Sequence, residues 1–432
     1  MSESTDLQSI EAQEVEAPLL STPRNDGRGL TPLVDSHSAF LAMIEELKSG
    51  TGPIAIDAER ASGYTYSQRA YLIQIYRREG GLHLIDPIAI TDLTLWKQLS
   101  DAFIECEWII HASTQDLPCL REVGLDPRRL FDTELGGRIA GCERVGLGPL
   151  TESLLGIRLA KEHSAVDWST RPLPEPWLNY AALDVDVLVD LRDKVEELLV
   201  QQKKLEWAQE EFASILTAPP APARVDPWRK TSGIHKIRDR RTLAIIREMW
   251  FARDAYARAI DKAPGRIFND EVHMEIAARR PANVDSFTKL ITRRKPNAKY
   301  PFAEWFDLLR GAIALPDDQL PPARLPSTSL PPPKVWQEKN PLAYARYTHA
   351  RARLAELSNE LSIPVENLVT PDYVRQTLWP EPPAEDWLGY VAASLARLGA
   401  RSWQIALVAP AIAPILGESE PLVVATEPPS DE

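Results

Sequence analysis

The first half of the chain alternates between short apolar runs and amphipathic stretches. Between about Leu33 and Leu216, apolar runs of four to eight residues are typical of buried strands, and longer stretches with helical spacing separate them. The expected strands are IAIDAE, YLIQIYRR, HLIDP and WIIHA. The expected helices are TLWKQLSDAF, Ser113–Glu122 and a long helix over roughly Glu175–Ser214. This pattern predicts an α/β domain with a mixed central sheet flanked by helices.

Beyond this domain the apolar spacing is helical, and proline-rich stretches interrupt it twice. The first interruption is TAPPAPARVDP and the second is LPDDQLPPARLPSTSLPPPK, which together hold many of the 37 prolines. Such segments act as stiff linkers between domains. The predicted organisation is an acidic disordered tail (1–32), the α/β domain (33–216), a linker (217–229), a helical domain (230–314), a linker (315–334), a second helical domain (335–416) and an acidic tail (417–432).

Composition removes several classes of protein. The N-terminal residues are acidic and polar, unlike a signal peptide, and the longest apolar stretch is too short and too rich in proline to span a bilayer. Three cysteines without a C-x-x-C pair support neither a disulfide framework nor a zinc ribbon. We therefore expect a cytoplasmic protein without membrane association, and a monomer.

The net charge of −13 argues at first against a polyanionic partner such as nucleic acid. The charge is unevenly distributed, however. Residues 224–300 hold 19 Lys and Arg against 9 Asp and Glu, a net charge of +10, whereas residues 1–223 carry −16 and residues 301–432 carry −7. A basic helical module inside an acidic chain is typical of a surface that binds a phosphate backbone. A solvated, arginine-rich helical surface without a ligand is the alternative.

The first predicted strand contains two carboxylates in an otherwise apolar run. Asp57 and Glu59 are two residues apart, so their side chains leave the same face of the sheet. Two neighbouring carboxylates repel each other and take up protons unless a cation lies between them. Divalent cations such as Mg²⁺ prefer such oxygen ligands. Alternating acidic residues also occur on ordinary edge strands, so this pair alone is a weak signal.

Three further polar residues extend the set. Asp116 follows the strand WIIHA, at the edge of the sheet where α/β proteins usually place their sites. Tyr180 and Asp184 are four residues apart and share one face of a predicted helix. Taken singly, each has an ordinary structural explanation, such as an acidic residue at a helix N-terminus or a half-buried tyrosine.

Together these residues resemble the DEDD superfamily of 3′–5′ exonucleases, in the branch with a tyrosine in its third motif, and within it the ribonuclease D family. The resemblance covers about residues 33–216 and rests on Asp57-Ala58-Glu59, on His111 with Asp116, on DWSTRPL, and on Tyr180 with Asp184. It implies a ribonuclease H-like fold. The segment RTLAIIREMWFARDAYARAIDKAPGRIFNDEVHMEIAARRP resembles an HRDC domain, and the second helical domain is compatible with a divergent second copy.

The resemblance implies hydrolysis of RNA from its 3′ end with two divalent cations, Mg²⁺ or Mn²⁺, and release of nucleoside 5′-monophosphates. Asp57, Glu59, Asp116 and Asp184 are the expected metal ligands. Tyr180 is expected to orient the attacking water, since a phenol with an ordinary pKa near 10 is a weak base at neutral pH. His111 is expected to be structural. Transfer-RNA precursors are the substrates that the family implies, and the basic helical domain is expected to contact the nucleic acid.

Two features depart from the family pattern. Ala58 stands where Thr or Ser is usual, and Arg60 stands where an apolar residue is frequent. Neither removes a ligand, but both bear on how the 3′-terminal nucleotide is held. Two alternatives stay open: a DNA 3′–5′ exonuclease of the proofreading or Werner type, and a non-catalytic nucleic-acid-binding protein on the same scaffold.

Overall fold

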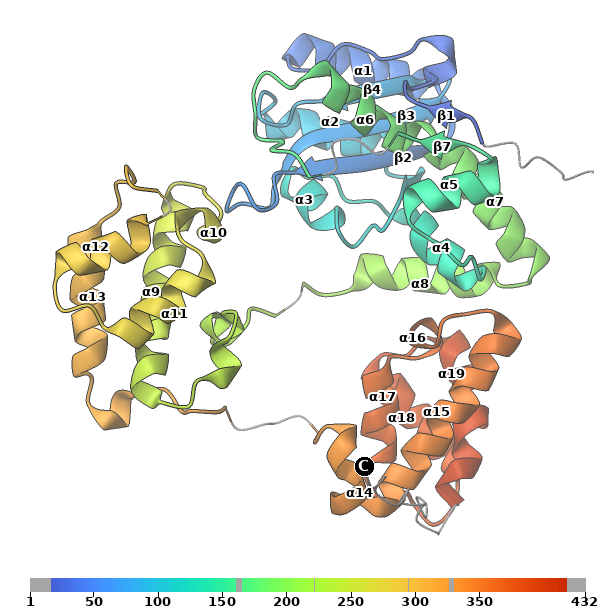
Figure 1. The fold of residues 1–432 in the computed structure, drawn as a ribbon. Coiled ribbons are helices and arrows are strands. Elements are labelled where there is room, and N and C mark those ends of the chain that lie inside the picture. The colour runs from blue at the N-terminus through green and yellow to red at the C-terminus, as the bar shows by residue number, and fades with distance from the viewer. Residues whose placement is uncertain (1–16, 161–164, 221, 294, 326–329, 418–432) are drawn as a thin grey trace, which may run out of the picture.

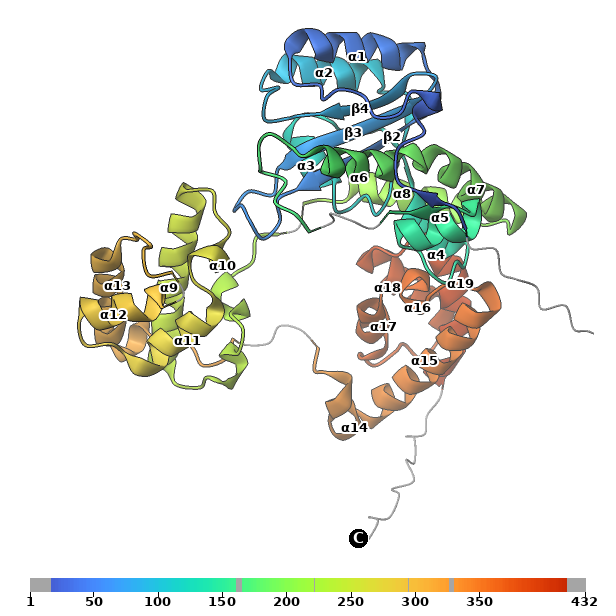
Figure 2. The same ribbon diagram turned by 45° about the horizontal axis from the view of Figure 1, so that its top comes forward.

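The computed structural model of the chain describes residues 17–160, 165–220, 222–293, 295–325 and 330–417. They form an α/β domain followed by two helical domains, coloured yellow and orange-red in Figure 1. Figure 2 shows the same three domains from a second direction. Among the described residues, no helix is long and apolar enough to cross a membrane.

The α/β domain is built on one mixed sheet of five strands in the order β4-β3-β2-β5-β6. Its strands are β2 (Thr51–Arg60), β3 (Ala70–Arg78), β4 (Gly81–Ile85), β5 (Glu107–Ile110) and β6 (Arg129–Asp132). The strand β2 lies at the centre, antiparallel to β3 and parallel to β5. The mixed sheet is as expected, and the four predicted strands correspond to β2 to β5.

Eight helices accompany this sheet within the described part of the α/β domain: α1 (His37–Ser49), α2 (Leu93–Ala102), α3 (Leu117–Glu122), α4 (Thr133–Ile139), α5 (Leu147–Leu155), α6 (Glu175–Asp186), α7 (Leu188–Gln201) and α8 (Leu205–Thr217). The long helix expected over Glu175–Ser214 is wrong. It is three helices, because the chain turns at Val187 and again at Lys203, which adopts a φ of 58°. The apolar spacing remains helical on both sides of each turn, so the pattern does not reveal the breaks.

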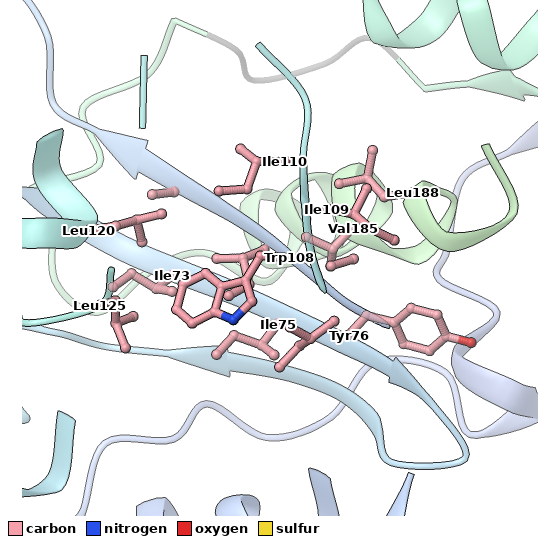
Figure 3. Close-up of a cluster of buried hydrophobic side chains, with 14 of the residues drawn as sticks. Ile73, Ile75, Tyr76, Trp108, Ile109, Ile110, Leu120, Leu125, Val185 and Leu188 are labelled. Atoms are coloured by element: carbon pink, nitrogen blue, oxygen red, sulfur yellow. The ribbon is translucent and has the colours of Figure 1, made fainter. Parts of the chain in front are cut away.

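The central strands β3 and β5 contribute large apolar side chains to the core of this domain. Side chains of β3 and β5, such as Ile73, Ile75 and Trp108, are almost fully buried. Figure 3 shows them together with Val185 and Leu188, through which α6 and α7 approach the sheet. Burial of this kind contributes roughly 25 cal/mol for each Å² of apolar surface removed from water. The helix α6 packs against β2, β3 and β4, and its Ala181, Ala182 and Val185 are fully buried there.

The tail expected over residues 1–32 needs correction for residues 17–32. Leu19–Leu20 (β1) pairs in parallel with Arg158–Leu159 (β7), and the Asn25 side chain is fully buried. Asn25 Oδ1 accepts a hydrogen bond from the backbone N–H of Leu82. The backbone N–H of Asn25 donates a hydrogen bond to the carboxylate of Asp186. Short polar segments without apolar spacing give no sign of such contacts in the sequence. Residues 1–16 and 418–432 lie outside the described residues.

Each helical domain has its own core. The first contains α9 (Arg240–Ala259), α10 (Pro264–Ile267), α11 (Asp270–Arg279), α12 (Val284–Thr292) and α13 (Phe302–Ala314). The second contains α14 (Trp336–Lys339), α15 (Pro341–Leu361), α16 (Val365–Leu368), α17 (Pro371–Leu378), α18 (Trp387–Leu398) and α19 (Ser402–Ile412). Both are helical as expected.

The linkers are shorter than the proline-rich stretches suggested. Trp228, placed in the linker 217–229 by the sequence, is fully buried in the core of the first helical domain. Within the linker 315–334, the carbonyls of Asp317, Leu320 and Pro321 accept hydrogen bonds from Arg240 of α9. Proline content does not indicate where a linker ends, because neighbouring residues pack onto the domains that they join.

Candidate active site

The strand β2 presents two carboxylates on one face of the sheet. Asp57 and Glu59 pair with Gln74 and Leu72 of β3, while Ala58 between them is buried on the opposite face. Both carboxylates are half-buried. Their common face is the one that α6 covers, because Asp184 of that helix approaches them. The geometry predicted from their spacing is thus present.

The helix α6 brings two residues to the same place. Asp57, Glu59 and Asp184 each offer a carboxylate oxygen, and these three atoms lie within 4.8 Å of one another. Tyr180, one turn before Asp184, forms a side-chain hydrogen bond with it. The helix begins at Glu175 with Pro176 in its first turn, a position that suits proline because no intrahelical donor is lost there.

Asp116 lies at the N-terminus of α3, just beyond β5, and its residue is 6% exposed. It is the N-cap residue rather than a residue of the first turn, because the expected helix over Ser113–Glu122 begins only at Leu117. The preceding turn is held by Asp132, which accepts hydrogen bonds from the backbone of Ser113 and from its hydroxyl. Asp116 is not among the three carboxylates within 4.8 Å. It is nonetheless close enough for its charge to affect them.

The pKa values of these carboxylates report a crowded, poorly hydrated site. Burial raises the pKa of Asp57 to about 6, and the nearby charge of Arg60 opposes this rise. Burial, with the charge of Asp57 added, raises the pKa of Asp116 to about 8. Burial and the surrounding carboxylates also raise the pKa values of Glu59 and Asp184. Such a set holds protons in the absence of a cation.

This donor set fits hard divalent cations. All four acidic side chains offer oxygen, which Mg²⁺ and Mn²⁺ prefer, and no soft ligand is among them. Among the described residues, Arg60 is the cationic side chain paired with the cluster, with its Nη2 3.7 Å from Asp116 Oδ1. A single guanidinium leaves most of the negative charge uncompensated. The site is therefore suited to binding metal cations.

His111 is not part of the cluster. Its Nδ1 lies 2.9 Å from the hydroxyl of Thr133, and burial lowers its pKa. A neutral imidazole bound to a hydroxyl at the end of β5 agrees with the structural role that the sequence predicts for it.

The segment DWSTRPL fixes the chain that enters α6. Arg171 donates to both carboxylate oxygens of Asp86, at 2.7 and 2.8 Å, and to the carbonyl of Tyr71. Trp168 is almost fully buried and lies edge-on to Trp177 of α6. Sequence reasoning noted this segment only as a family resemblance and did not identify Asp86 or Asp132. Asp86 directly follows β4, and Asp132 is the last residue of β6. This position at the end of a strand was the only sign of a role in the sequence.

Comparison with known proteins decides the family. Residues 32–200 match a family model described as a 3′–5′ exonuclease, residues 242–308 match the HRDC domain, and residues 329–416 match a 3′ to 5′ exonuclease C-terminal domain. A ribonuclease D of Gluconacetobacter diazotrophicus is 31% identical over 277 residues, which cover 62% of this chain and 68% of that protein. The chain belongs to the ribonuclease D family.

Other relatives agree. A ribonuclease D of Acidiphilium cryptum is 33% identical over 234 residues, 52% of this chain and 58% of that protein. The chain is also similar to a protein of known structure from Bifidobacterium adolescentis, with 36% identity and a TM-score of 0.84 over 93% of this chain and all of that one. The structure of Escherichia coli RNase D shares the fold at 23% identity, with a TM-score of 0.62 over 89% of this chain and 98% of that one.

Membership of the ribonuclease D family confirms several predictions made from the sequence. The chain is a nuclease of the 3′–5′ exoribonuclease class, with a mixed-sheet exonuclease domain, an HRDC domain and a helical C-terminal domain. The family model that matches the C-terminal domain is distinct from the HRDC model. A second, divergent HRDC copy in that region stays a prediction.

Proposed function

We propose that this chain shortens RNA from the 3′ end by hydrolysis at the carboxylate cluster, with two divalent cations, Mg²⁺ or Mn²⁺, bound there. The observation that carries the proposal is the convergence of Asp57, Glu59 and Asp184 within 4.8 Å, with Asp116 near enough to interact electrostatically. When bound, such cations activate a water molecule and stabilise the charge that develops on phosphate and leaving oxygen. The products are nucleoside 5′-monophosphates.

The four carboxylates would hold the cations and keep them fixed relative to the scissile phosphate. Asp57 and Glu59 come from the central strand β2, Asp184 from the helix α6 packed on that strand, and Asp116 from the N-terminus of α3. Ligands from three separate elements of one core keep their relative positions during turnover. This pre-organisation is what electrostatic stabilisation of a transition state requires.

Tyr180 is proposed to orient the attacking water. Burial, together with the carboxylates of Asp184, Glu59 and Asp57, raises the pKa of its phenol. The phenol therefore stays protonated at neutral pH and acts as a hydrogen-bond donor and acceptor rather than as a general base. Its hydrogen bond with Asp184 fixes the direction of the hydroxyl.

The HRDC domain is proposed to hold the phosphate backbone of the substrate. Residues 224–300 carry a net charge of +10, and part of this domain contacts the loop that follows β2. Attraction to phosphate depends on this local charge rather than on the net charge of the chain. We propose transfer-RNA precursors with a 3′ extension as the substrates. We also propose that the enzyme acts as a monomer in the cytoplasm.

The test uses the alanine variant of the central ligand. With a 5′-end-labelled single-stranded RNA and Mg²⁺, wild-type protein should give a ladder of products shortened stepwise at the 3′ end. Asp57→Ala should reduce the rate at least about 100-fold, since a lost ligand costs more than a lost hydrogen bond to a ligand. Asp101→Ala, which removes an exposed carboxylate that pairs with Lys97, should leave the rate unchanged. Stepwise shortening by Asp57→Ala at the wild-type rate would contradict the assignment of the site.

A DNA exonuclease remains the main alternative, because none of the side chains described above distinguishes a ribose from a deoxyribose. Matched RNA and DNA oligonucleotides of the same sequence separate the two. We expect a clear preference for RNA, from membership of the ribonuclease D family. Equal or faster hydrolysis of DNA would favour the alternative while leaving the metal site intact.

A further inference from the structure

Gln74 is a polar side chain without any hydrogen-bond partner in the described part of the protein. It lies in the middle of β3, its exposed fraction is 0%, and both its Nε2 and its Oε1 are buried and unsatisfied. Burying an amide without a compensating hydrogen bond is costly, and a leucine or methionine would fill the same space without that cost. An amide at this position therefore needs an explanation.

The position of Gln74 in the sheet explains why an amide is present. Gln74 is the direct cross-strand partner of Asp57, and directly paired residues of antiparallel strands project from the same face. The neighbours of Gln74 on this face of β3 are Leu72, opposite Glu59, and Tyr76, opposite Ala55. Gln74 is thus the amide that the sheet places beside the central carboxylate of the site. The helix α6, which carries Asp184, packs against the same two strands.

We propose that Gln74 is a positioning residue for the metal ligand Asp57. The Nε2–H group of Gln74 donates a hydrogen bond to the carboxylate of Asp57 when cations are bound, and so fixes the orientation of that carboxylate. Carboxylates that ligate metals are generally held by hydrogen bonds of this kind, and removing such a partner typically weakens metal affinity about 10–100-fold. This inference rests on the proposed metal site, and it assigns to Gln74 no contact with substrate.

The competing explanation is a purely structural amide that is satisfied by a buried water. The two explanations predict opposite changes for Gln74→Met, which keeps the shape and removes the amide. If Gln74 serves Asp57, the metal-free variant loses an unsatisfied group and should unfold at the same temperature as wild type or higher, while its affinity for Mn²⁺ falls. If the amide is merely structural, the variant should lose stability and bind Mn²⁺ normally.

The experiment measures Mn²⁺ binding to the full-length protein by isothermal titration calorimetry, together with thermal unfolding of the metal-free form. We expect Gln74→Met to bind Mn²⁺ about 10–100-fold more weakly than wild type. The matched control is Gln404→Met, which removes a buried amide bonded to the carbonyl of Asn367 in the C-terminal domain and should leave Mn²⁺ affinity unchanged. Gln74→Leu provides a second variant if methionine does not yield folded protein.

The outcomes separate this inference from the proposed function. Wild-type protein that binds Mn²⁺ no better than Asp57→Asn would overturn the metal site itself. Wild-type protein that binds Mn²⁺ tightly, with Asp57→Asn impaired and both Gln74 variants within twofold of wild type, would overturn the role of Gln74 alone. Weakened binding by the folded Gln74 variants, with Gln404→Met unaffected, would support it.

Discussion

At the scale of single residues, the site is a balance between the burial of carboxylates and the cation that compensates them. The sequence was sufficient to place Asp57 with Glu59 and Tyr180 with Asp184, because the periods of a strand and a helix determine which side chains share a face. It was not sufficient to show how near Asp116 comes, or that Arg60 pairs with it at 3.7 Å. These relations depend on tertiary packing and on where α3 begins.

The raised pKa values predict how stability depends on pH in metal-free protein. A carboxyl whose pKa is higher in the folded than in the unfolded state stabilises the fold while it is protonated and loses this contribution as pH rises. With folded-state pKa values of about 6 for Asp57 and about 8 for Asp116, the metal-free protein should lose stability between about pH 4 and pH 8.

Thermal unfolding in the presence of a chelator, from pH 5 to pH 8, measures this effect. The unfolding temperature should fall as pH rises, and the stabilisation gained by adding Mg²⁺ should grow over the same range. Asp57→Asn should flatten the profile, since the amide does not ionise. A chelated wild-type protein that becomes more stable over this range, with Asp57→Asn identical to it, would contradict the electrostatic description of the site.

Tyr180→Phe should show the part of the phenol in orienting water when kcat is measured at saturating Mn²⁺. The variant removes the hydroxyl that bonds to Asp184 but no metal ligand. We expect kcat to fall by about 10²-fold, a loss typical of a misplaced reacting group. The lost hydrogen bond to the ligand Asp184 should also weaken Mn²⁺ binding in calorimetric titration, by up to about 10–100-fold, so kcat is compared at saturating Mn²⁺. An unchanged kcat would show that the phenol has no part in the reaction.

At the scale of elements, the positions of helices and strands were more predictable than their ends. The strands β2 to β5 followed from apolar runs, whereas the breaks between α6, α7 and α8 are turns of one to three residues within a helical pattern. The segment before α6 shows why such details matter. Arg171 ties it to Asp86 at the end of β4, and so fixes where α6 begins and where Tyr180 and Asp184 point.

Arg171→Leu should therefore destabilise the exonuclease domain and misplace α6. The change leaves the 5%-exposed Asp86 without its two charge-assisted hydrogen bonds, at a cost of about 3 kcal/mol. Arg128→Leu removes an exposed ion pair with Glu105 and should cost less than about 1 kcal/mol. Urea unfolding followed by tryptophan fluorescence compares them, and equal stabilities of the two variants would contradict this role of Arg171.

At the scale of the whole molecule, both helical domains contact the exonuclease domain at defined places. Asp261, just beyond α9, accepts hydrogen bonds from Ser67 and Tyr71, and Arg266 stacks on Tyr64 at 3.8 Å. These contacts hold the HRDC domain on the loop that follows the catalytic strand β2. Trp403 of α19 stacks on Trp207 of α8. Arg401, which precedes α19, forms an ion pair with Glu211 of α8. Figures 1 and 2 show the two helical domains next to separate parts of the exonuclease domain.

The sequence predicted three domains and the charge of each, but none of these contacts, because residues that meet across domains leave no periodic pattern. Asp261→Ala should loosen the HRDC domain without touching the catalytic carboxylates. We expect a several-fold lower kcat/KM on an RNA of 25 nucleotides, a weaker salt dependence of binding, and little change on one of five nucleotides. Asp285→Ala, on the exposed first turn of α12, is the control. Equal losses on both RNAs would indicate damage to the active site instead.

The chemistry itself is tested most directly by hydrolysis of RNA in water enriched in ¹⁸O, with mass spectrometry of the released nucleotides. Attack of a water molecule on the phosphorus, with the 3′-oxygen of the preceding nucleotide as leaving group, places one ¹⁸O in the phosphate of each nucleoside 5′-monophosphate. We predict this product from wild-type protein with Mg²⁺, and its loss in Asp57→Ala and in the presence of a chelator. Release of nucleoside 3′-phosphates, or of 5′-monophosphates that form equally in Asp57→Ala, would contradict hydrolysis at the carboxylate cluster.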